Sequence, residues 1–384
     1  MSTQLKISSK LPDVKTSIFA IMSKMANEYN AINLSQGFPD FNCSEQLIEL
    51  VHHFMKNGNN QYAPMQGTIE LRKQISLKVK RDYGREYNPE REITVTAGAT
   101  QALYTAFSAL VNKGDEVIIF EPAYDSYLPA IIANGGIPIA IKLNTIDFSI
   151  PWQEVEKSIT KKTKCIVFNS PHNPTGAILK SNDLIQLERI VKNTNIFLIS
   201  DEVYEHIIFD NQKHLSFAGY NELAKRSFII SSFGKTFHTT GWKMGYCCAP
   251  EYLTTEFRKF HQFIVFTVNT PIQLAVAEFL KDVTNIYLLP HFYQAKRDLF
   301  SSFIKNSKFI LKNCDGTYFQ LLDYSRISDK NDLEFSEYLT KEIGVAVIPI
   351  SPFYKDGTNN KLIRVCFAKR DEVLKEAAEK LVSI

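Results

Sequence analysis

One lysine and one aspartate in this chain have the residue types and surroundings that imine chemistry needs. Lys235 lies in the segment Ser232-Phe233-Gly234-Lys235, among small and hydroxyl-bearing residues. Asp201 ends the apolar run Ile199-Ser200-Asp201. A lysine amine forms a Schiff base with an aldehyde, and a carboxylate holds the proton of a pyridine-type ring nitrogen. Together, the two residues indicate an enzyme that binds a reactive aldehyde carried on a nitrogen heterocycle.

Two other interpretations of Lys235 are open from its local sequence. Ser232 and Lys235 also fit the S-x-x-K pattern of penicillin-binding enzymes, in which the serine is the nucleophile. Those enzymes also carry S-D-N and K-T-G tripeptides, and neither occurs in this sequence. The other interpretation is an ordinary solvent-exposed lysine, which describes most lysines in proteins. The presence of Asp201 favours imine chemistry over both.

The elements that position these residues alternate between short apolar strands and helical patterns. We expect strands at 93–96, 116–120, 137–143, 165–168, 196–199, 228–230 and 244–248, with helices between several of them at 100–112, 124–133 and 181–192. Apolar strands separated by helices predict an α/β fold with a mostly parallel sheet covered on both faces. Ligands bind such sheets beyond the carboxyl ends of the strands. Gly98, Tyr124, Asn173, Asp201 and Lys235 all follow strand ends, so we expect them to share one site.

The chain also predicts two further segments around this sheet. At 384 residues it exceeds one ordinary core. Residues 1–44 are expected to form an irregular N-terminal arm that joins the small domain, and 45–285 the large domain. Ser44 is placed to cap a helix that ends near Gly58, and Gly84 to end another. A long helix at 286–311 then leads into a small α+β domain, 286–384, with strands at 317–322, 345–350 and 362–367 and helices near 332–342 and 371–382.

Composition excludes several classes of function. With 44 basic and 41 acidic residues, the net charge of +3 gives no reason to expect nucleic acid or an anionic membrane as a partner. The six cysteines have no zinc-type spacing, so no metal site is predicted, and they are typical of buried thiols in a reducing compartment. No apolar run is long enough to span a membrane, and residues 1–15 lack a secretory signal. A cytoplasmic protein is therefore expected.

The motifs resemble those of a known family. The segments are Asn169-Ser170-Pro171-His172-Asn173-Pro174-Thr175-Gly176, Asp201-Glu202-Val203-Tyr204, Ser232 to Tyr246 and Ile363-Arg364-Val365. They are similar to the signatures of the class I/II aminotransferases, which use pyridoxal 5'-phosphate and have the transferase fold of type I. The resemblance runs from Gln36 to Arg364, nearly the full chain.

The resemblance assigns cofactor-binding and catalytic roles. It implies that Lys235 holds the cofactor covalently and transfers protons, and that Asp201 pairs with the ring nitrogen. Tyr204 and Asn173 are implied to bond the phenolate oxygen, Tyr124 to stack on the ring, and Ser232 and Lys243 to bind the phosphate. In the family, the turn matching Gly98-Ala99-Thr100 cradles that phosphate, and backbone N–H groups at a helix N-terminus suit an anion.

The resemblance also implies a substrate site and a homodimer. Arg364, Gly37 and Asn173 are implied to bind the substrate, and the planar guanidinium of Arg364 suits the α-carboxylate. The alternative for Arg364 is a structural salt bridge to an internal acid. Tyr62 matches a tyrosine that reaches the neighbouring subunit's cofactor phosphate. Ile18-Phe19 and Phe266 are implied to line the side-chain pocket, with Phe266 contributed by the partner subunit.

The closest branch contains kynurenine/glutamine and bacterial methionine aminotransferases. Ile18-Phe19 stands where kynurenine-type members carry tryptophan, and Phe266-Thr267 where they carry an aromatic residue followed by histidine. An uncharged pocket favours methionine or an aromatic donor. The alternatives are a kynurenine/glutamine aminotransferase, a cysteine-S-conjugate β-lyase on the same fold, and a non-catalytic pyridoxal-phosphate regulator. The regulator usually carries a helix-turn-helix, for which there is no room before Ser35.

Overall fold

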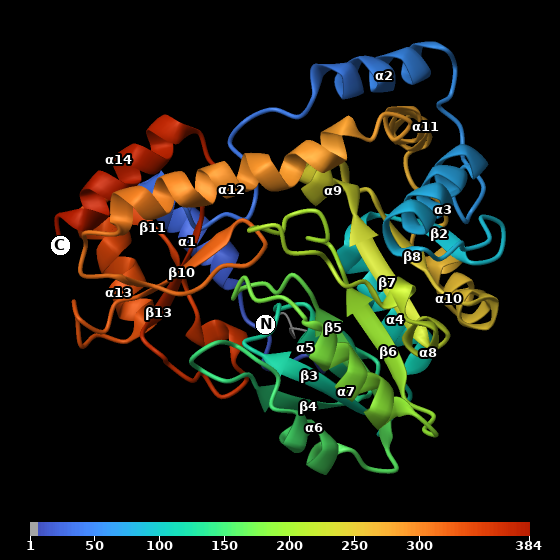
Figure 1. Ribbon diagram of the computed structural model, residues 1–384, viewed down its shortest axis with the longest axis horizontal. Coiled ribbons are helices and arrows are strands. Elements are labelled where there is room, and N and C mark those ends of the chain that lie inside the picture. The colour runs from blue at the N-terminus through green and yellow to red at the C-terminus, as the bar shows by residue number, and fades with distance from the viewer. Residues whose placement is uncertain (1–6) are drawn as a thin grey trace, which may run out of the picture.

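A seven-stranded sheet forms the centre of the larger part of the molecule (Figure 1). The computed structural model describes residues 7–384. In spatial order the strands are β2 (Ile93–Thr96), β8 (Gly245–Cys248), β7 (Ser227–Ser232), β6 (Phe197–Asp201), β5 (Thr163–Asn169), β3 (Glu116–Glu121) and β4 (Ile137–Lys142). All run parallel except β8, which is antiparallel to both β2 and β7. Apart from their end residues, these are the strands that the sequence predicts.

Alternate residues of the strands belong to two different cores, because successive side chains of a strand point to opposite faces. In β5, Ile166 and Phe168 pack into one core, while Cys165 and Val167 pack into the other. The second core is covered by α4 (Gly98–Leu110), α5 (Tyr127–Ala133) and α10 (Glu251–Ile264). The first is covered by α2 (Glu45–Lys56), α3 (Ile69–Tyr83), α6 (Trp152–Ser158), α7 (Ser181–Val191) and α11 (Thr270–Phe279). The sheet is therefore buried on both faces, as its apolar strands predict.

A second, antiparallel sheet lies at the other end of the molecule (Figure 1). Its strands are, in order, β12 (Ile348–Pro349), β13 (Leu362–Cys366), β10 (Phe319–Asp323) and β9 (Ile310–Leu311). The long helix α12 (Thr284–Ile304) reaches from beside α11 to this unit, where it packs against α14 (Asp371–Val382). Two successive elements, α13 (Asp332–Tyr338) and the π-helical turn η3 (Leu339–Ile343), complete it.

Three details differ from the sequence-based expectation. The N-terminal arm is not irregular: it contains α1 (Ile18–Glu28), which starts where Ser17 accepts a bond from an α1 amide, and β1 (Ile32–Asn33). The strand expected at 345–350 is split, because β11 (Val345–Ala346) pairs with β1 while β12 pairs with β13. The helix expected to reach residue 311 ends at Ile304, because 310–311 instead pair with β10.

Short elements complete the description. They are η1 (Phe217–Gly219), α8 (Asn221–Ala224), α9 (Phe233–Thr236), η2 (Thr240–Trp242) and η4 (Ser351–Phe353). Gly84 ends α3 with φ of 79°, as predicted, whereas Ser44 precedes α2 without a side-chain capping bond. Within residues 7–384, every helix is too short or too polar to cross a membrane.

Candidate active site

A cleft of about 230 Å³ lies at the carboxyl ends of the central strands, between the two sheets. Turns after β2, β6 and β7 form one wall, and β10, β13 and α1 contribute side chains to the other. The predicted site residues that line it are Phe19, Gly37, Gly98, Ala99, Thr100, Tyr124, Asn173, Asp201, Tyr204, Ser232, Lys235, Lys243 and Arg364. The fold therefore gathers these residues from distant parts of the sequence at one place.

Three predicted pocket residues lie outside this cleft. Ile18 and Phe19 both pack against the large core, but Ile18, one step away along α1, does not line the cleft. The Tyr62 side chain is 82% exposed, and its ring meets that of Phe266 edge-to-face at 5.4 Å. Within one chain, Tyr62 and Phe266 form a surface pair. Their assigned roles stay predictions that need a second subunit.

Lys235 occupies α9, the single helical turn that follows β7. Its Nζ donates to Tyr318 Oη at 2.8 Å and to the Gly37 carbonyl at 3.1 Å. Burial lowers the pKa of Lys235 to about 8, and the positive charges of Arg364 and Lys243 act in the same direction. Because the neutral amine is the nucleophile and the base, this environment makes Lys235 reactive near neutral pH.

Asp201 ends β6 and is fully enclosed. Its carboxylate accepts a hydrogen bond from Tyr127 Oη at 2.5 Å and one from the Val203 amide at 3.3 Å. Burial raises its pKa to about 6, while the bond from Tyr127 opposes that rise. The Asn169 side chain donates to the Asp201 carbonyl at 3.0 Å, which ties the end of β6 to that of β5. A carboxylate held in this way can pair with a cationic ring nitrogen.

The N-terminus of α4 forms an anion cradle with Lys243. Gly98 opens α4 with a positive φ of 75°, and a Cβ there would lie 3.3 Å from Lys243 Nζ. Ser232 Oγ accepts a bond from the Gly234 amide at 3.2 Å and lies in the same cleft. Helix-end amides, an ammonium and a hydroxyl together are the donors that bind a phosphate group.

Arg364 is a buried cation within β13, and it is 1% exposed. Its guanidinium donates to Asn173 Oδ1 at 2.6 Å and to the Ser35 carbonyl at 3.4 Å, and its Nε has no partner among the described residues. It also lies 3.8 Å from the centre of the Phe319 ring. None of the ion pairs among the described residues involves Arg364, which argues against the alternative of a structural salt bridge. A buried guanidinium with free donor capacity suits a carboxylate ligand.

The family model for class I and II aminotransferases matches residues 29–381. The chain belongs to this family. It is 48% identical over 374 residues to the methionine aminotransferase of Escherichia coli, a match that covers 97% of each chain. The solved structure of that bacterium's YbdL, reported to have methionine aminotransferase function, covers 99% of this aminotransferase with a TM-score of 0.97.

Other relatives have different substrates in their names. The N-succinyldiaminopimelate aminotransferase structure from Mycobacterium tuberculosis gives a TM-score of 0.94 at 35% identity, covering 98% of this aminotransferase and all of that chain. A kynurenine–oxoglutarate transaminase from Dictyostelium discoideum is 33% identical, covering 100% of this chain and 98% of its own. Both the α/β fold of the aminotransferases and their chemistry are therefore established for the chain, in agreement with the sequence-based prediction.

The aminotransferases depend on pyridoxal 5'-phosphate, and the groups in the cleft fit this cofactor. Lys235 offers an amine of lowered pKa for the aldehyde, and buried Asp201 offers a carboxylate for the ring nitrogen. The turn at Gly98, together with Lys243, matches the phosphate. Tyr124 lines the same cleft and is available to stack on the ring.

Several residues at the site were not predicted from sequence. Tyr127 bonds Asp201, Tyr318 bonds Lys235, and Phe319 covers Arg364. Tyr127 lies three residues after Tyr124, which the sequence analysis places at the site, so it could have been considered. Tyr318 and Phe319 begin an ordinary apolar strand, and nothing local distinguishes them from core residues.

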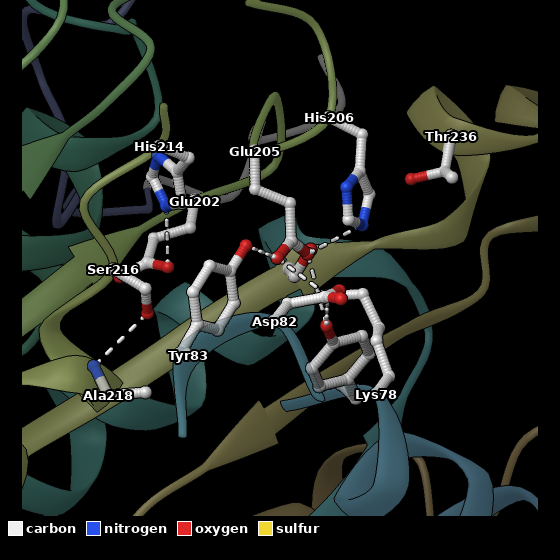
Figure 2. A network of polar contacts seen from close by, with 12 residues as sticks. Lys78, Asp82, Tyr83, Glu202, Glu205, His206, His214, Ser216, Ala218 and Thr236 are labelled. Atoms are coloured by element: carbon white, nitrogen blue, oxygen red, sulfur yellow. Dashed lines mark hydrogen bonds and ion pairs between the residues drawn. The ribbon is translucent and has the colours of Figure 1, made fainter. Parts of the chain in front are cut away.

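A buried polar network supports the site from behind (Figure 2). Glu205, which follows Tyr204, accepts bonds from Lys78 at 2.6 Å, from Tyr83 at 2.5 Å and from Ser231 at 2.5 Å. Although burial disfavours its charge, Lys78 and the neighbouring histidines hold the pKa of Glu205 well below its usual range. The network joins α3, β7 and the turn after β6, so it fixes the turn that carries Tyr204.

Proposed function

We propose that this aminotransferase moves the amino group of methionine, or of an aromatic amino acid, to a 2-oxo acid. The observation that supports this proposal is the set of charged side chains that line the cleft. Among the described residues that line it, the charged ones are Asp201, Lys235, Lys243 and Arg364, and each already has a role. A donor with a side-chain carboxylate therefore meets no second cation, and an unpaired buried carboxylate is strongly disfavoured.

The remaining lining supplies apolar surface near the carboxylate site. Phe19 and Phe319 both lie against the Arg364 guanidinium, with ring centres 5.2 Å and 3.8 Å away. A thioether or aromatic side chain gains by contact with such rings. The methionine aminotransferase of E. coli, at 48% identity, supports the same assignment. Kynurenine transaminases at about a third identity make kynurenine the second candidate donor.

The roles of the chain's own residues follow from their positions. Arg364 and Asn173 hold the substrate α-carboxylate. Lys235 as a neutral amine removes the Cα proton and, once protonated, would deliver a proton to the carbon of the cofactor's aldehyde group. Asp201 holds positive charge on the ring nitrogen, and Tyr204 donates to the phenolate oxygen. The bound cofactor supplies an electron-accepting ring that makes the Cα proton acidic.

We also propose a cytoplasmic homodimer. Two aromatic residues with assigned site roles, Tyr62 and Phe266, lie on the surface, where they are 82% and 48% exposed. A second copy that covers them would bring them to its own cleft. The division into an arm (1–44), a large domain (45–285) and a small domain (286–384) is part of the same proposal.

The donor is tested by half-reactions. The purified enzyme is mixed with methionine, phenylalanine, kynurenine, glutamine and aspartate in turn, and the loss of the cofactor's absorption band is timed. We expect methionine and phenylalanine to differ by about 10–200-fold at most, since apolar pockets discriminate weakly. Aspartate as the fastest donor would overturn the proposal. Release of pyruvate, ammonia and thiol from a cysteine S-conjugate would instead identify the β-lyase.

The dimer is tested by subunit complementation. Tyr62→Ala and Lys235→Ala proteins are each expected to be poorly active alone. Mixed subunits should regain activity, because one of the two clefts then combines an intact Lys235 with an intact partner Tyr62. Full activity in a species shown by light scattering to be a monomer would contradict the shared site.

A further inference from the structure

Tyr318 is a fully buried residue held by the backbone on both sides. Thr317, with φ of 67°, donates its amide to the Ile207 carbonyl, and the Phe367 amide donates to the Tyr318 carbonyl. A Cβ on Gly316 would lie 2.7 Å from the Pro171 side chain, so that backbone is pressed against the turn after β5. The position of the Tyr318 ring is therefore determined by both parts of the molecule.

The Tyr318 hydroxyl joins the reactive lysine to the N-terminal arm. It lies 2.5 Å from the Gly37 carbonyl, which can only accept, so the hydroxyl proton points there. Its lone pairs then face Lys235 Nζ, which donates to Tyr318 Oη at 2.8 Å. The carbonyl of Gly37 accepts a second bond from the same Nζ at 3.1 Å. The amine is thus held between two oxygens of fixed position.

We propose that Tyr318 is a positioning residue that orients the Lys235 amine for proton transfer, an inference that rests on the proposed role of Lys235. Lysine carries four flexible side-chain bonds, and an amine used as a base must sit at one place to act in one direction. Tyr204, whose ring packs at 5.2 Å against that of Tyr318, is assigned to the cofactor itself. The Tyr318 hydroxyl instead bonds Lys235 and the Gly37 carbonyl.

The bond has a predictable effect on the proton affinity of Lys235. An oxygen that accepts from an ammonium stabilises the charged form, so its removal lowers the pKa of the amine. The titratable and aromatic groups that act on the charge of Lys235 are unchanged by a substitution at Tyr318; they are Asp201, Lys243, Arg364, Cys366 and the ring of Tyr204. The Gly37 carbonyl keeps its bond from Nζ and loses only the bond from the Tyr318 hydroxyl. A lower pH midpoint for the titration of Lys235 in a variant without the Tyr318 hydroxyl would therefore show the effect of the lost hydrogen bond.

The chain offers a matched control in Tyr293 of α12. Its ring centre lies 5.6 Å from that of Tyr318, it is equally buried, and its hydroxyl has no hydrogen-bond partner in the part of the chain that the structure describes. Tyr293→Phe removes the same atom from the same aromatic cluster without touching Lys235. Any effect of a missing buried oxygen on packing appears in both variants.

The experiment uses the full-length protein reconstituted with pyridoxamine 5'-phosphate, which leaves Lys235 unlinked. Acetic anhydride labels the amine across a pH series, and peptide mass spectrometry reads the Lys235 peptide. Compared with wild type, Tyr318→Phe should lower the midpoint by about one pH unit, the size expected for a charge-assisted bond. Tyr293→Phe should keep the wild-type midpoint. An unchanged midpoint in Tyr318→Phe would overturn the proposal.

A second readout separates positioning from packing. In the methionine half-reaction, Tyr318→Phe should slow proton transfer on the order of 100-fold and raise the isotope effect of Cα deuteration, with KM little changed. A wild-type isotope effect, or an equal loss in Tyr293→Phe, would contradict positioning. If Tyr318→Phe does not fold, Tyr318→3-fluorotyrosine keeps the hydroxyl as a weaker acceptor. It should lower the midpoint by less, and no change in its midpoint would contradict the proposal.

Failure of the proposed function is distinguishable from failure of this inference. If Lys235→Ala still formed a borohydride-reducible link to the cofactor, the role of Lys235 itself would be wrong. If Lys235→Ala lost that link while Tyr318→Phe behaved like Tyr293→Phe, only the role of Tyr318 would be wrong.

Discussion

Replacing Asp201 with asparagine should stabilise the cofactor-free protein while it removes most of the activity. The Asp201 carboxyl has a pKa of about 6 in the folded chain against an ordinary value of 3.8, because burial disfavours its charge. A difference of about two pH units corresponds to about 3 kcal/mol at 1.36 kcal/mol per unit. The neutral amide avoids this cost and still accepts a bond from Tyr127. We therefore expect a gain of up to about 3 kcal/mol at pH 7.

The sign of the pH dependence follows from which state binds the extra proton. Between pH 3.8 and about 6, the folded protein holds a proton on Asp201 that the unfolded chain has released. The cost is therefore absent below about pH 4, grows as the pH rises, and is complete above about pH 6. Asp201→Asn and wild type should be equally stable at pH 4 and should diverge by pH 7.

Urea unfolding of the two cofactor-free proteins between pH 4 and 8 measures this difference. Asp147→Asn is the control, because Asp147 is exposed and bonds from Ser149 lower its pKa, so its loss brings no gain. A gain that is missing at pH 7, or one that persists at pH 4, would show that burial does not destabilise the Asp201 charge. With cofactor bound, near-normal turnover of Asp201→Asn would refute the role of this carboxylate.

Three other substitutions test the site. Arg364→Lys should raise KM for amino donors and oxo acids alike by at least about tenfold, because a lost charge-assisted bidentate contact is worth ~1.5–3 kcal/mol. An unchanged KM in steady-state assays would contradict carboxylate binding by Arg364. Lys235→Ala should abolish transamination and the link to the cofactor that borohydride fixes, as measured by absorbance and mass spectrometry. Glu205→Gln should leave the buried Lys78 ammonium without its counter-charge and lower stability by roughly 3–5 kcal/mol in thermal unfolding; a melting temperature equal to wild type would show that Lys78 finds another partner.

Sequence patterns were sufficient for the large sheet and for most of the cleft. Apolar runs such as 93–96 and 196–199 identify strands because both faces of this sheet are buried. Polar residues directly after such runs share one edge of the sheet, so Asp201 and Lys235 could be placed together without knowledge of their distance. The limits of 44 and 285 for the domains remain predictions.

Contacts between distant segments could not be predicted in the same way. The local sequence around Tyr318 is typical of a core aromatic residue. Its hydroxyl reaches Lys235 because the small sheet lies close to α9. The strand expected at 345–350 is divided by pairing with β1, a segment more than three hundred residues away in the chain. Ile18 and Phe19 are adjacent in sequence and both pack against the large core, yet only Phe19 also lines the cleft. Local pattern carries no information on such pairings.

The antiparallel strand β8 determines when this enzyme can become functional during its synthesis. Strand β2 leaves the ribosome early, but among residues 7–384 it pairs with β8 alone, with Thr96 opposite Gly245. A nascent chain that stops before β8 therefore exposes β2 as an unpaired edge, the kind of surface on which chains aggregate. A chain that stops before residue 243 also lacks Lys243, so the turn at Gly98 then has no ammonium beside it. Capture of the cofactor phosphate must follow this long-range closure, which makes loading with cofactor a late event in the folding of the chain.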